Sequence, residues 1–330
     1  MTPPRLLIIQ TAYLGDTVFT SALVQSLRRT WPGAEIDLCV APRGRDVARA
    51  IPGVNFVHVF DKRGADAGLR GLRRLSARLA TRQYPLAILP HRSLRTALLA
   101  RLAGIPRRVG FADAPASFLY TERVRSKAGT FIEQEADLAA HFGAGPAAMA
   151  LQPLREWVGA AHGALAHSAS ERLAAVCLGS EWETKIWPAQ HVKALVRLLA
   201  GKGLRPVLIG GPRERELARE VGAAGGCIDT TGNPVGEALA ILSMSTIAVG
   251  GDTGLVHAAR ALGVPTVAVF GPTAPGAHRF GPRERAVTLG LSCSPCSAHG
   301  SRRCPLGHHR CLRDLDADRV AAACQEVLPA

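Results

Sequence analysis

The feature that most constrains the fold is a repeated alternation of short apolar runs with amphipathic helical segments along the whole chain. In the first half the apolar runs lie at residues 6–10, 35–40, 55–60, 86–90 and 107–111. In the second half they lie at residues 174–180, 206–210, 227–230, 247–250 and 265–270. Strands separated by helices predict parallel α/β sheets joined by right-handed crossovers.

The chain is also too long, at 330 residues, for one ordinary hydrophobic core. The alternation is interrupted near residues 145–170, where an Ala/Gly-rich stretch offers no strand pattern. We therefore expect an N-terminal domain over residues 1–160 and a C-terminal domain over 161–330, both Rossmann-like and facing each other across a cleft. Ligands of open α/β sheets bind beyond the carboxyl ends of the strands.

The net charge of the chain limits the classes of molecule that it is expected to bind. Forty Lys and Arg against 26 Asp and Glu give a net charge of +14, which favours an anionic partner. The alternative is that a GC-rich genome, which favours Arg codons, produces the same charge balance. No helix-turn-helix, RNP or zinc-finger pattern supports a nucleic acid. Because the chain has no long apolar run and no signal-peptide pattern at its N-terminus, we expect it to stay in the cytosol.

One acidic residue lies where the first strand pattern turns into a helical pattern. The loop "TAYLGDT" separates the apolar run from the helix expected over residues 18–30, and it contains Asp16. Such a turn presents free backbone N–H groups, which bind anions. A carboxylate is a poor phosphate ligand, so Asp16 is expected either to cap the helix or to act chemically on something else.

A second strand-to-helix loop, "GSEWETKIWPAQH", covers residues 179–191. Gly179 and Ser180 let the backbone approach a ligand, Lys185 adds a cation, and Pro188 suits a helix start. Together these residues predict a phosphate cradle. The alternative is an ordinary surface loop with a lysine beside a packed tryptophan.

A third loop, "GGDTGLVH", follows the apolar run that ends at Gly250. Asp252 and Thr253 are both able to cap the next helix, and His257 lies one turn further on. The loop predicts a pyrophosphate site; the alternatives are a simple cap and a helix histidine without a partner. No G-x-G-x-x-G and no G-x-x-x-x-G-K-[ST] follows these strands, which argues against a standard NAD site and a P-loop.

Four segments, in this order, resemble one family: "LLIIQTAYLGDTVFTSALVQSLRRTWPGAEIDLCV", "GSEWETKIWP", "GDTGLVHAARALGVPTVAVFGPT" and "CSPCSAHGSRRCPLGHHRCL". They resemble glycosyltransferase family nine, the heptosyltransferases that build the inner core of lipopolysaccharide. The last segment is most similar to the heptosyltransferase II branch. The resemblance implies a GT-B fold, with the acceptor on the N-terminal domain and ADP-heptose on the C-terminal domain. It also implies an inverting transfer that needs no cofactor or catalytic metal.

The resemblance assigns roles by position. Asp16 would be the general base, and Lys185 would contact the diphosphate. The remaining substrate contacts would be Ser180, Glu181, Asp252, Thr253, Gly254 and His257. Glu181 departs from the small residue that the family has there, and Gly251 departs from a bulkier one. The acceptor would be the lipopolysaccharide inner core at the cytoplasmic face of the inner membrane. A relative acting on another core sugar or on a protein, a non-catalytic basic membrane-surface protein, and a sugar-nucleotide epimerase remain alternatives.

Two further features stay open. Cys293, Cys296, Cys304 and Cys311 form the pattern C-x₂-C-x₇-C-x₆-C, which is typical of a zinc or iron site, although a packed reduced loop or one disulfide fits as well. Any metal there would be structural. The helix expected over residues 64–82 would place Arg70, Arg73, Arg74, Arg78 and Arg82 on one side, and Leu69, Leu72, Leu75 and Leu79 on the core side. That basic face predicts either contact with an anionic membrane or a solvated surface.

Overall fold

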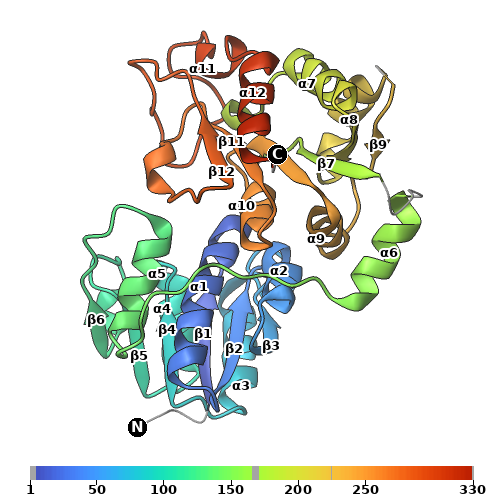
Figure 1. Ribbon diagram of the computed structural model, residues 1–330. Coiled ribbons are helices and arrows are strands. Elements are labelled where there is room, and N and C mark those ends of the chain that lie inside the picture. Colours follow the sequence, from blue (N-terminus) through green and yellow to red (C-terminus); the bar gives the residue numbers. More distant parts are fainter. Residues whose placement is uncertain (1–4, 166–170, 224, 329–330) are drawn as a thin grey trace. The chain divides into compact units, whose positions relative to one another are not determined.

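The structure is a computed structural model that describes residues 5–165, 171–223 and 225–328, and it divides into two compact units, Met1–Gln152 and Pro153–Ala330 (Figure 1). Each unit is built around one six-stranded sheet in which every pair of neighbouring strands is parallel. The parallel α/β prediction is therefore confirmed. Residues 166–170, where part of the expected linker falls, lie outside the described residues.

The first sheet has the order β3-β2-β1-β4-β5-β6. Its strands are β1 (Arg5–Gln10), β2 (Glu35–Val40), β3 (Val54–Val59), β4 (Leu86–Leu89), β5 (Arg107–Phe111) and β6 (Glu122–Val124). The helices α1 (Leu14–Thr30), α2 (Arg45–Ala50) and α5 (Phe131–Ala140) pack together. The helices α3 (Gly68–Ala80) and α4 (Leu94–Leu102) form a second layer with a core that includes Leu7, Ile9 and Leu75.

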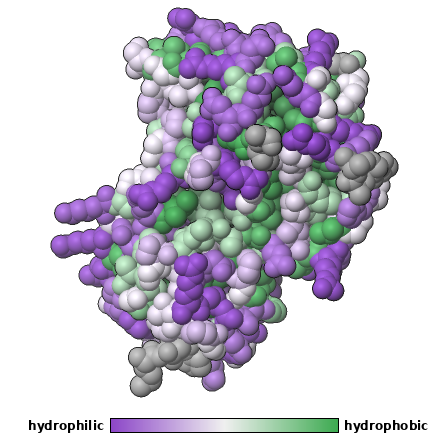
Figure 2. Space-filling model, in the orientation of Figure 1, coloured by the Kyte–Doolittle hydropathy of each residue, from purple (hydrophilic) through white to green (hydrophobic). Residues whose placement is uncertain are grey.

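The second sheet has the order β12-β11-β10-β7-β8-β9. Its strands are β7 (Arg172–Cys177), β8 (Leu204–Ile209), β9 (Ile228–Asp229), β10 (Ile247–Gly251), β11 (Thr266–Val269) and β12 (Glu284–Val287). The helices α6 (Arg155–Leu165), α9 (Val235–Met244) and α10 (Gly254–Ala261) pack on one another. The helices α7 (Ala189–Gly201), α8 (Arg215–Gly222) and α12 (Ala317–Val327) form the other layer, with Leu195, Val249 and Val320 in its core. Figure 2 shows hydrophilic residues over much of the surface in this view, with more hydrophobic residues between them.

Both sheets have the same strand order when the strands are counted within each unit: 3-2-1-4-5-6, the order of the Rossmann fold. The order reverses between β1 and β4, where Ile8 lies opposite Ile88, and between β7 and β10, where Val176 lies opposite Val249. Ligands bind at the carboxyl edge of such a reversal. The loops after β1, β4, β7 and β10 are therefore the places to look for a site.

Some boundaries differ from the expected ones. Helix α1 begins at Leu14 rather than Val18, so Asp16 lies inside its first turn and not in the preceding loop. Sequence analysis also missed β6 and β12, because these short edge strands carry charged residues such as Glu122 and Arg285 and form no apolar run. None of the helices in the described ranges is long and apolar enough to cross a membrane.

The arginine-rich helix α3 only partly follows its expected pattern. Leu72, Leu75 and Leu79 are buried, but Leu69 is 68% exposed, so its predicted place in the core is wrong. At 100° per residue, Leu69 lies about 90° from the centre of the buried face, at its rim in the first turn. The basic face is also partly neutralised: Arg74 and Arg78 contact the Asp66 carboxylate at 3.2 and 3.5 Å, and Arg82 contacts Asp37 at 2.9 Å.

Candidate active site

The strand reversal of the second sheet brings two of the expected loops together. Lys185 ends a short 3₁₀ turn, η3 (Glu183–Lys185), in the loop after β7. Asp252 follows β10 directly. The Lys185 Nζ atom lies 2.7 Å from Asp252 Oδ2, and only 13% of the lysine side chain is exposed. The loops that sequence analysis treated separately thus share one ion pair.

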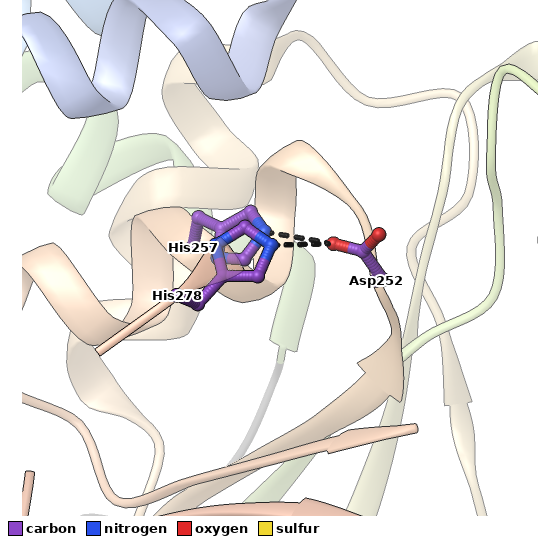
Figure 3. Close-up of side chains that lie close together, drawn as sticks. All are labelled: Asp252, His257 and His278. Atoms are coloured by element: carbon purple, nitrogen blue, oxygen red, sulfur yellow. Dashed lines mark hydrogen bonds and ion pairs between the residues drawn. The ribbon is translucent and has the colours of Figure 1, made fainter. Parts of the chain in front are cut away.

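The Asp252 carboxylate is the centre of this site. Its Oδ2 accepts hydrogen bonds from Lys185 and from the Thr273 hydroxyl, both at 2.7 Å. Its Oδ1 lies 3.0 Å from His257 Nε2 and 3.5 Å from His278 Nε2, and the two imidazoles stack at 4.4 Å (Figure 3). Burial opposes the charge of Asp252, but the His257 hydrogen bond and the Lys185 cation outweigh it and hold the carboxyl pKa below its ordinary value.

Two hydrogen bonds of His257 indicate its protonation state. The Arg260 guanidinium has only donors and lies 3.2 Å from His257 Nδ1, so Nδ1 accepts. The hydrogen of the ring is therefore on Nε2, which donates to Asp252. Burial lowers the pKa of His257, consistent with a neutral ring. Arg260 itself is fixed by Glu284, at 3.0 Å.

Asp252, His257 and His278 are a group whose potential metal-ligand atoms all lie within 4.8 Å of one another. A metal at His257 Nε2 would need that nitrogen's lone pair, yet Arg260 already occupies the lone pair of Nδ1. Lys185 adds a positive charge at the same carboxylate. These donors therefore fit a hydrogen-bonded carboxylate better than a bound cation. Burial and the neighbouring His257 lower the pKa of His278 to about 3, so its ring is neutral as well.

The start of α10 adds polar groups that have no partner within the described residues. Thr253 is the N-cap residue, but its hydroxyl makes no capping bond. The Thr253 Oγ1 atom is buried, and no hydrogen-bond partner is found for it in the described part of the chain. Gly254 begins the helix, where the first backbone N–H groups point outward. A buried hydroxyl without a partner at a helix N-terminus indicates a place prepared for an anionic ligand.

The remaining predicted residues of this unit lie in the loop after β7. Ser180 is half-buried, and its hydroxyl accepts from the Trp182 N–H at 3.3 Å. Glu181 is exposed. The unexpected glycine at position 251 has a clear reason: a Cβ atom there would lie 2.7 Å from the Lys185 carbonyl oxygen. A side chain at that position would displace the lysine-bearing loop.

Asp16 lies in the other unit, at the strand reversal of the first sheet. It is half-buried in the first turn of α1, and its Oδ2 accepts from the Tyr13 N–H at 3.0 Å. The carboxylate therefore has a capping contact. His91, in the loop after β4, lies 3.2 Å from the Thr11 hydroxyl in the loop before α1. Burial lowers the pKa of His91 to about 4, which keeps this ring neutral.

A second carboxyl group lies beneath Asp16. Glu135 of α5 is buried, with Oε1 3.1 Å from the Thr20 hydroxyl, and Thr20 donates to the Asp16 carbonyl at 2.9 Å. The same hydroxyl is also placed to donate to Glu135 Oε1, and it accepts from the Gln10 side-chain amide at 3.3 Å. Burial raises the pKa of Glu135 to about 8, and the neighbouring Asp16 charge adds to the effect. The carboxyl is therefore neutral at pH 7.

We expect Glu135→Gln to be more stable than the parent at alkaline pH. In the folded state Glu135 stays protonated up to about pH 8, whereas in the unfolded chain it ionises near its ordinary value. The protonated carboxyl therefore makes its full contribution to the free energy of unfolding below the pKa that Glu135 has in the unfolded chain. As the pH rises from that value to about 8, the contribution is lost by about 1.4 kcal/mol for each pH unit. Urea unfolding at pH 5 and pH 8 checks this, with Glu133→Gln on the same helix as control. An equal pH dependence in parent and Gln variant would contradict it.

Sequence analysis missed several of these residues. Thr273 and His278 follow β11. They could have been predicted as site residues only from the rule that ligands bind beyond the carboxyl ends of strands. Arg260 and Glu135 lie within helices and look like ordinary amphipathic positions. Their roles depend on contacts between elements far apart in the chain.

The four cysteines of the C-x₂-C-x₇-C-x₆-C pattern do not form a comparable ligand group within the described residues. Cys293 and Cys304 are half-buried, Cys296 is exposed and Cys311 is buried, and all four are free thiols. The disulfide alternative is therefore not seen in this structure. The cysteines instead lie in a segment that contacts the Lys185 loop, as described below.

Comparison with known proteins agrees with the geometry. A family model described as glycosyltransferase family 9 (heptosyltransferase) matches residues 72–309. The lipopolysaccharide heptosyltransferase 2 of Salmonella typhimurium is 29% identical over 341 residues, which cover 96% of this chain and 96% of that protein.

Two solved structures share the fold. The E. coli ADP-heptose lipopolysaccharide heptosyltransferase II superposes with a TM-score of 0.80 at 23% identity, covering 98% of each chain. The E. coli heptosyltransferase WaaC with ADP superposes with a TM-score of 0.77 at 22% identity, covering 98% of this chain and 99% of that one. The expected GT-B fold class is thereby confirmed.

Proposed function

This chain belongs to glycosyltransferase family 9, the heptosyltransferases, and we propose that it transfers a heptose from ADP-heptose to the inner core of lipopolysaccharide. The observation that carries the donor half of this proposal is the anion site at the start of α10. There a buried Thr253 hydroxyl lacks a hydrogen-bond partner among the described residues, the helix α10 begins at Gly254, and Lys185 lies 2.7 Å from the neighbouring Asp252 carboxylate. A nucleoside diphosphate is the anion that such a Rossmann edge suits.

The diphosphate is the leaving group of the proposed reaction. Its negative charge grows as the sugar bond breaks, and Lys185 and the N-terminus of α10 supply fixed positive charge and N–H donors. Asp252 pairs with Lys185 and is hydrogen-bonded to His257. Both residues, together with Ser180, Glu181, Thr253 and Gly254, are proposed to contact ADP and heptose. Because protein groups supply the positive charge, the transfer requires no catalytic metal or other cofactor.

The acceptor hydroxyl must lose a proton as the new bond forms, and we assign that proton to Asp16. Attack from the face opposite the leaving group makes the transfer inverting. The role of base belongs to the first unit and the diphosphate contacts to the second. In this proposal residues 1–160 bind the acceptor, and residues 161–330 bind the donor.

The test is incubation of the protein with ADP-heptose and lipopolysaccharide cores truncated at successive sugars, read by mass spectrometry. We expect one heptose to be added to one core, with release of ADP. The curated relative named above is a heptosyltransferase 2, so the core that already carries a first heptose is the expected acceptor. Absence of added mass on every core, with a correctly folded protein, would overturn the proposal.

A structural metal at Cys293, Cys296, Cys304 and Cys311 stays a prediction. Among the described residues these thiols do not form a group of three ligand atoms within 4.8 Å of one another, although Cys311 interacts electrostatically with the other three. Thiolates move together when they bind zinc or iron. Metal analysis of the purified, reduced protein decides it. A metal content far below one ion per chain would contradict the prediction.

A peripheral contact with an anionic membrane fits the phosphorylated acceptor and the charge of +14. We expect Arg70 and Arg73, both exposed on α3, to contribute most of the membrane-binding free energy that this helix provides, because Arg74 and Arg78 already contact Asp66. Replacing the first pair with Gln should reduce low-salt co-sedimentation with anionic vesicles, at about 1 kcal/mol per charge. The pair Arg74→Gln and Arg78→Gln removes the same charge and is the control. Equal sedimentation by both variants and the parent would contradict a role for this helix.

A further inference from the structure

Lys185 is confined on two sides by glycines that leave no space for a side chain. A Cβ atom on Gly251 would lie 2.7 Å from the Lys185 carbonyl oxygen. A Cβ atom on Gly300 would lie 2.8 Å from the Lys185 Cδ atom, and Gly300 has a φ of +96°, which side chains rarely allow. The backbone of Lys185 is thus held by the end of β10, and its alkyl chain by the segment of residues 293–311, which we name the cysteine segment.

The cysteine segment also bonds to every polar group of Thr184, the residue before Lys185. The Thr184 N–H and hydroxyl donate to the Ser301 carbonyl at 3.1 and 2.8 Å, and the Ser301 N–H donates to the Thr184 hydroxyl at 2.8 Å. The Thr184 carbonyl accepts from His309 Nε2 at 2.8 Å. Thr184 is only 4% exposed, so these bonds are shielded from competing water.

His309 is itself held in an unusual conformation. It has a φ of +50°, in the left-handed region that few residues other than glycine adopt. Burial raises the pKa of the Cys304 thiol slightly, but the nearby backbone N–H groups from Leu306 to His309 outweigh it and lower that pKa, and the Gly307 N–H donates to the Cys304 carbonyl at 3.0 Å. Directly after His309, the helix α11 (Arg310–Arg313) buries Leu312 in the core of the unit. A conformation fixed from both sides in this way indicates that the placement of the imidazole matters.

We infer that the cysteine segment is a brace that positions Lys185 for the diphosphate, with His309 and Thr184 as positioning residues. The inference rests on the proposed role of Lys185. A lysine side chain is long and flexible, and ordering it when a ligand binds reduces affinity. The contacts of Thr184 and Gly300 restrict the lysine to one position. The brace thus gives the cysteine segment a function that does not depend on a metal.

Calorimetric titration of the full chain with ADP tests the brace. We expect His309→Ala to weaken ADP binding by about three- to tenfold, the usual effect of losing one well-placed hydrogen bond. His309→Gln, whose amide Nε2 also donates, should restore most of the affinity. His299→Ala, an exposed histidine of the same segment, is the control and should bind like the parent.

A double-mutant cycle separates positioning from general damage. In a Lys185→Ala background, His309→Ala should cause no further loss of ADP affinity, because the residue that it positions is gone. Gly300→Ala places a Cβ atom against the Lys185 side chain and should weaken ADP binding in the parent by displacing it. The brace is overturned if the His309 and Gly300 variants bind ADP like the parent, or if the His309 loss persists without Lys185. Failure of Lys185→Ala itself to weaken binding would instead reject the proposed diphosphate contact.

Discussion

Asp16→Asn is expected to lower the rate of heptose transfer by about 10²–10⁴-fold, the usual contribution of a positioned base. The amide is close in shape to the carboxylate, and its oxygen is able to accept the Tyr13 N–H bond that Asp16 accepts at 3.0 Å. The helix start should therefore survive. Only the ability to take up a proton is removed.

ADP affinity should be unchanged in this variant, because Lys185, Asp252 and Thr253 all belong to the second unit. Asp16→Ala separates the two roles of the residue: it should be as inactive as the Asn variant and also less stable, by about 0.5–2 kcal/mol for a lost cap. Asp318→Asn, another acid in the first turn of a helix, is the matched control. Turnover near that of the parent in a stably folded Asp16→Asn protein would reject the base and leave only the cap.

The parallel sheets and the positions of Asp16 and Asp252 could be predicted from the sequence, because they depend on local sequence signals. Strand-to-helix alternation fixes a parallel sheet, and a polar residue just past a strand end must lie at the ligand edge, as Asp252 does. Asp16 followed from the same rule, although the structure moves it from a loop into the first turn of α1. In that turn the carboxylate accepts the Tyr13 N–H, so the capping contact and the proposed role as base concern the same side chain.

The rest could not be predicted, because it depends on contacts between distant segments. The pairing of Lys185 with Asp252 joins residues that are 67 positions apart, and nothing local marks it (252 − 185 = 67). Gly251 looked like a departure from the family, and only the approach of the Lys185 carbonyl explains it. The burial of Glu135 could not be predicted from the sequence, because its partner Thr20 lies on α1 and not on the helix that carries Glu135.

Lys185→Ala should weaken ADP binding by about tenfold or more, as expected when a charge-assisted hydrogen bond is lost. An ammonium group has three donors, and one of them is used by Asp252 at 2.7 Å, which leaves two for phosphate oxygens. Turnover should fall as well, since the same cation stabilises the departing diphosphate.

The comparison variant is Lys185→Met, which keeps an unbranched chain against Gly300 but removes the charge. If charge is what matters, Met and Ala variants should lose ADP affinity alike, and Lys185→Arg should keep part of it. Lys193→Ala is the control for a general loss of positive charge, because it removes the ion pair between Lys193 of α7 and Glu220 of α8. Unchanged ADP affinity in both neutral variants would mean that Lys185 serves only to balance the buried Asp252, and the diphosphate site would have to lie elsewhere.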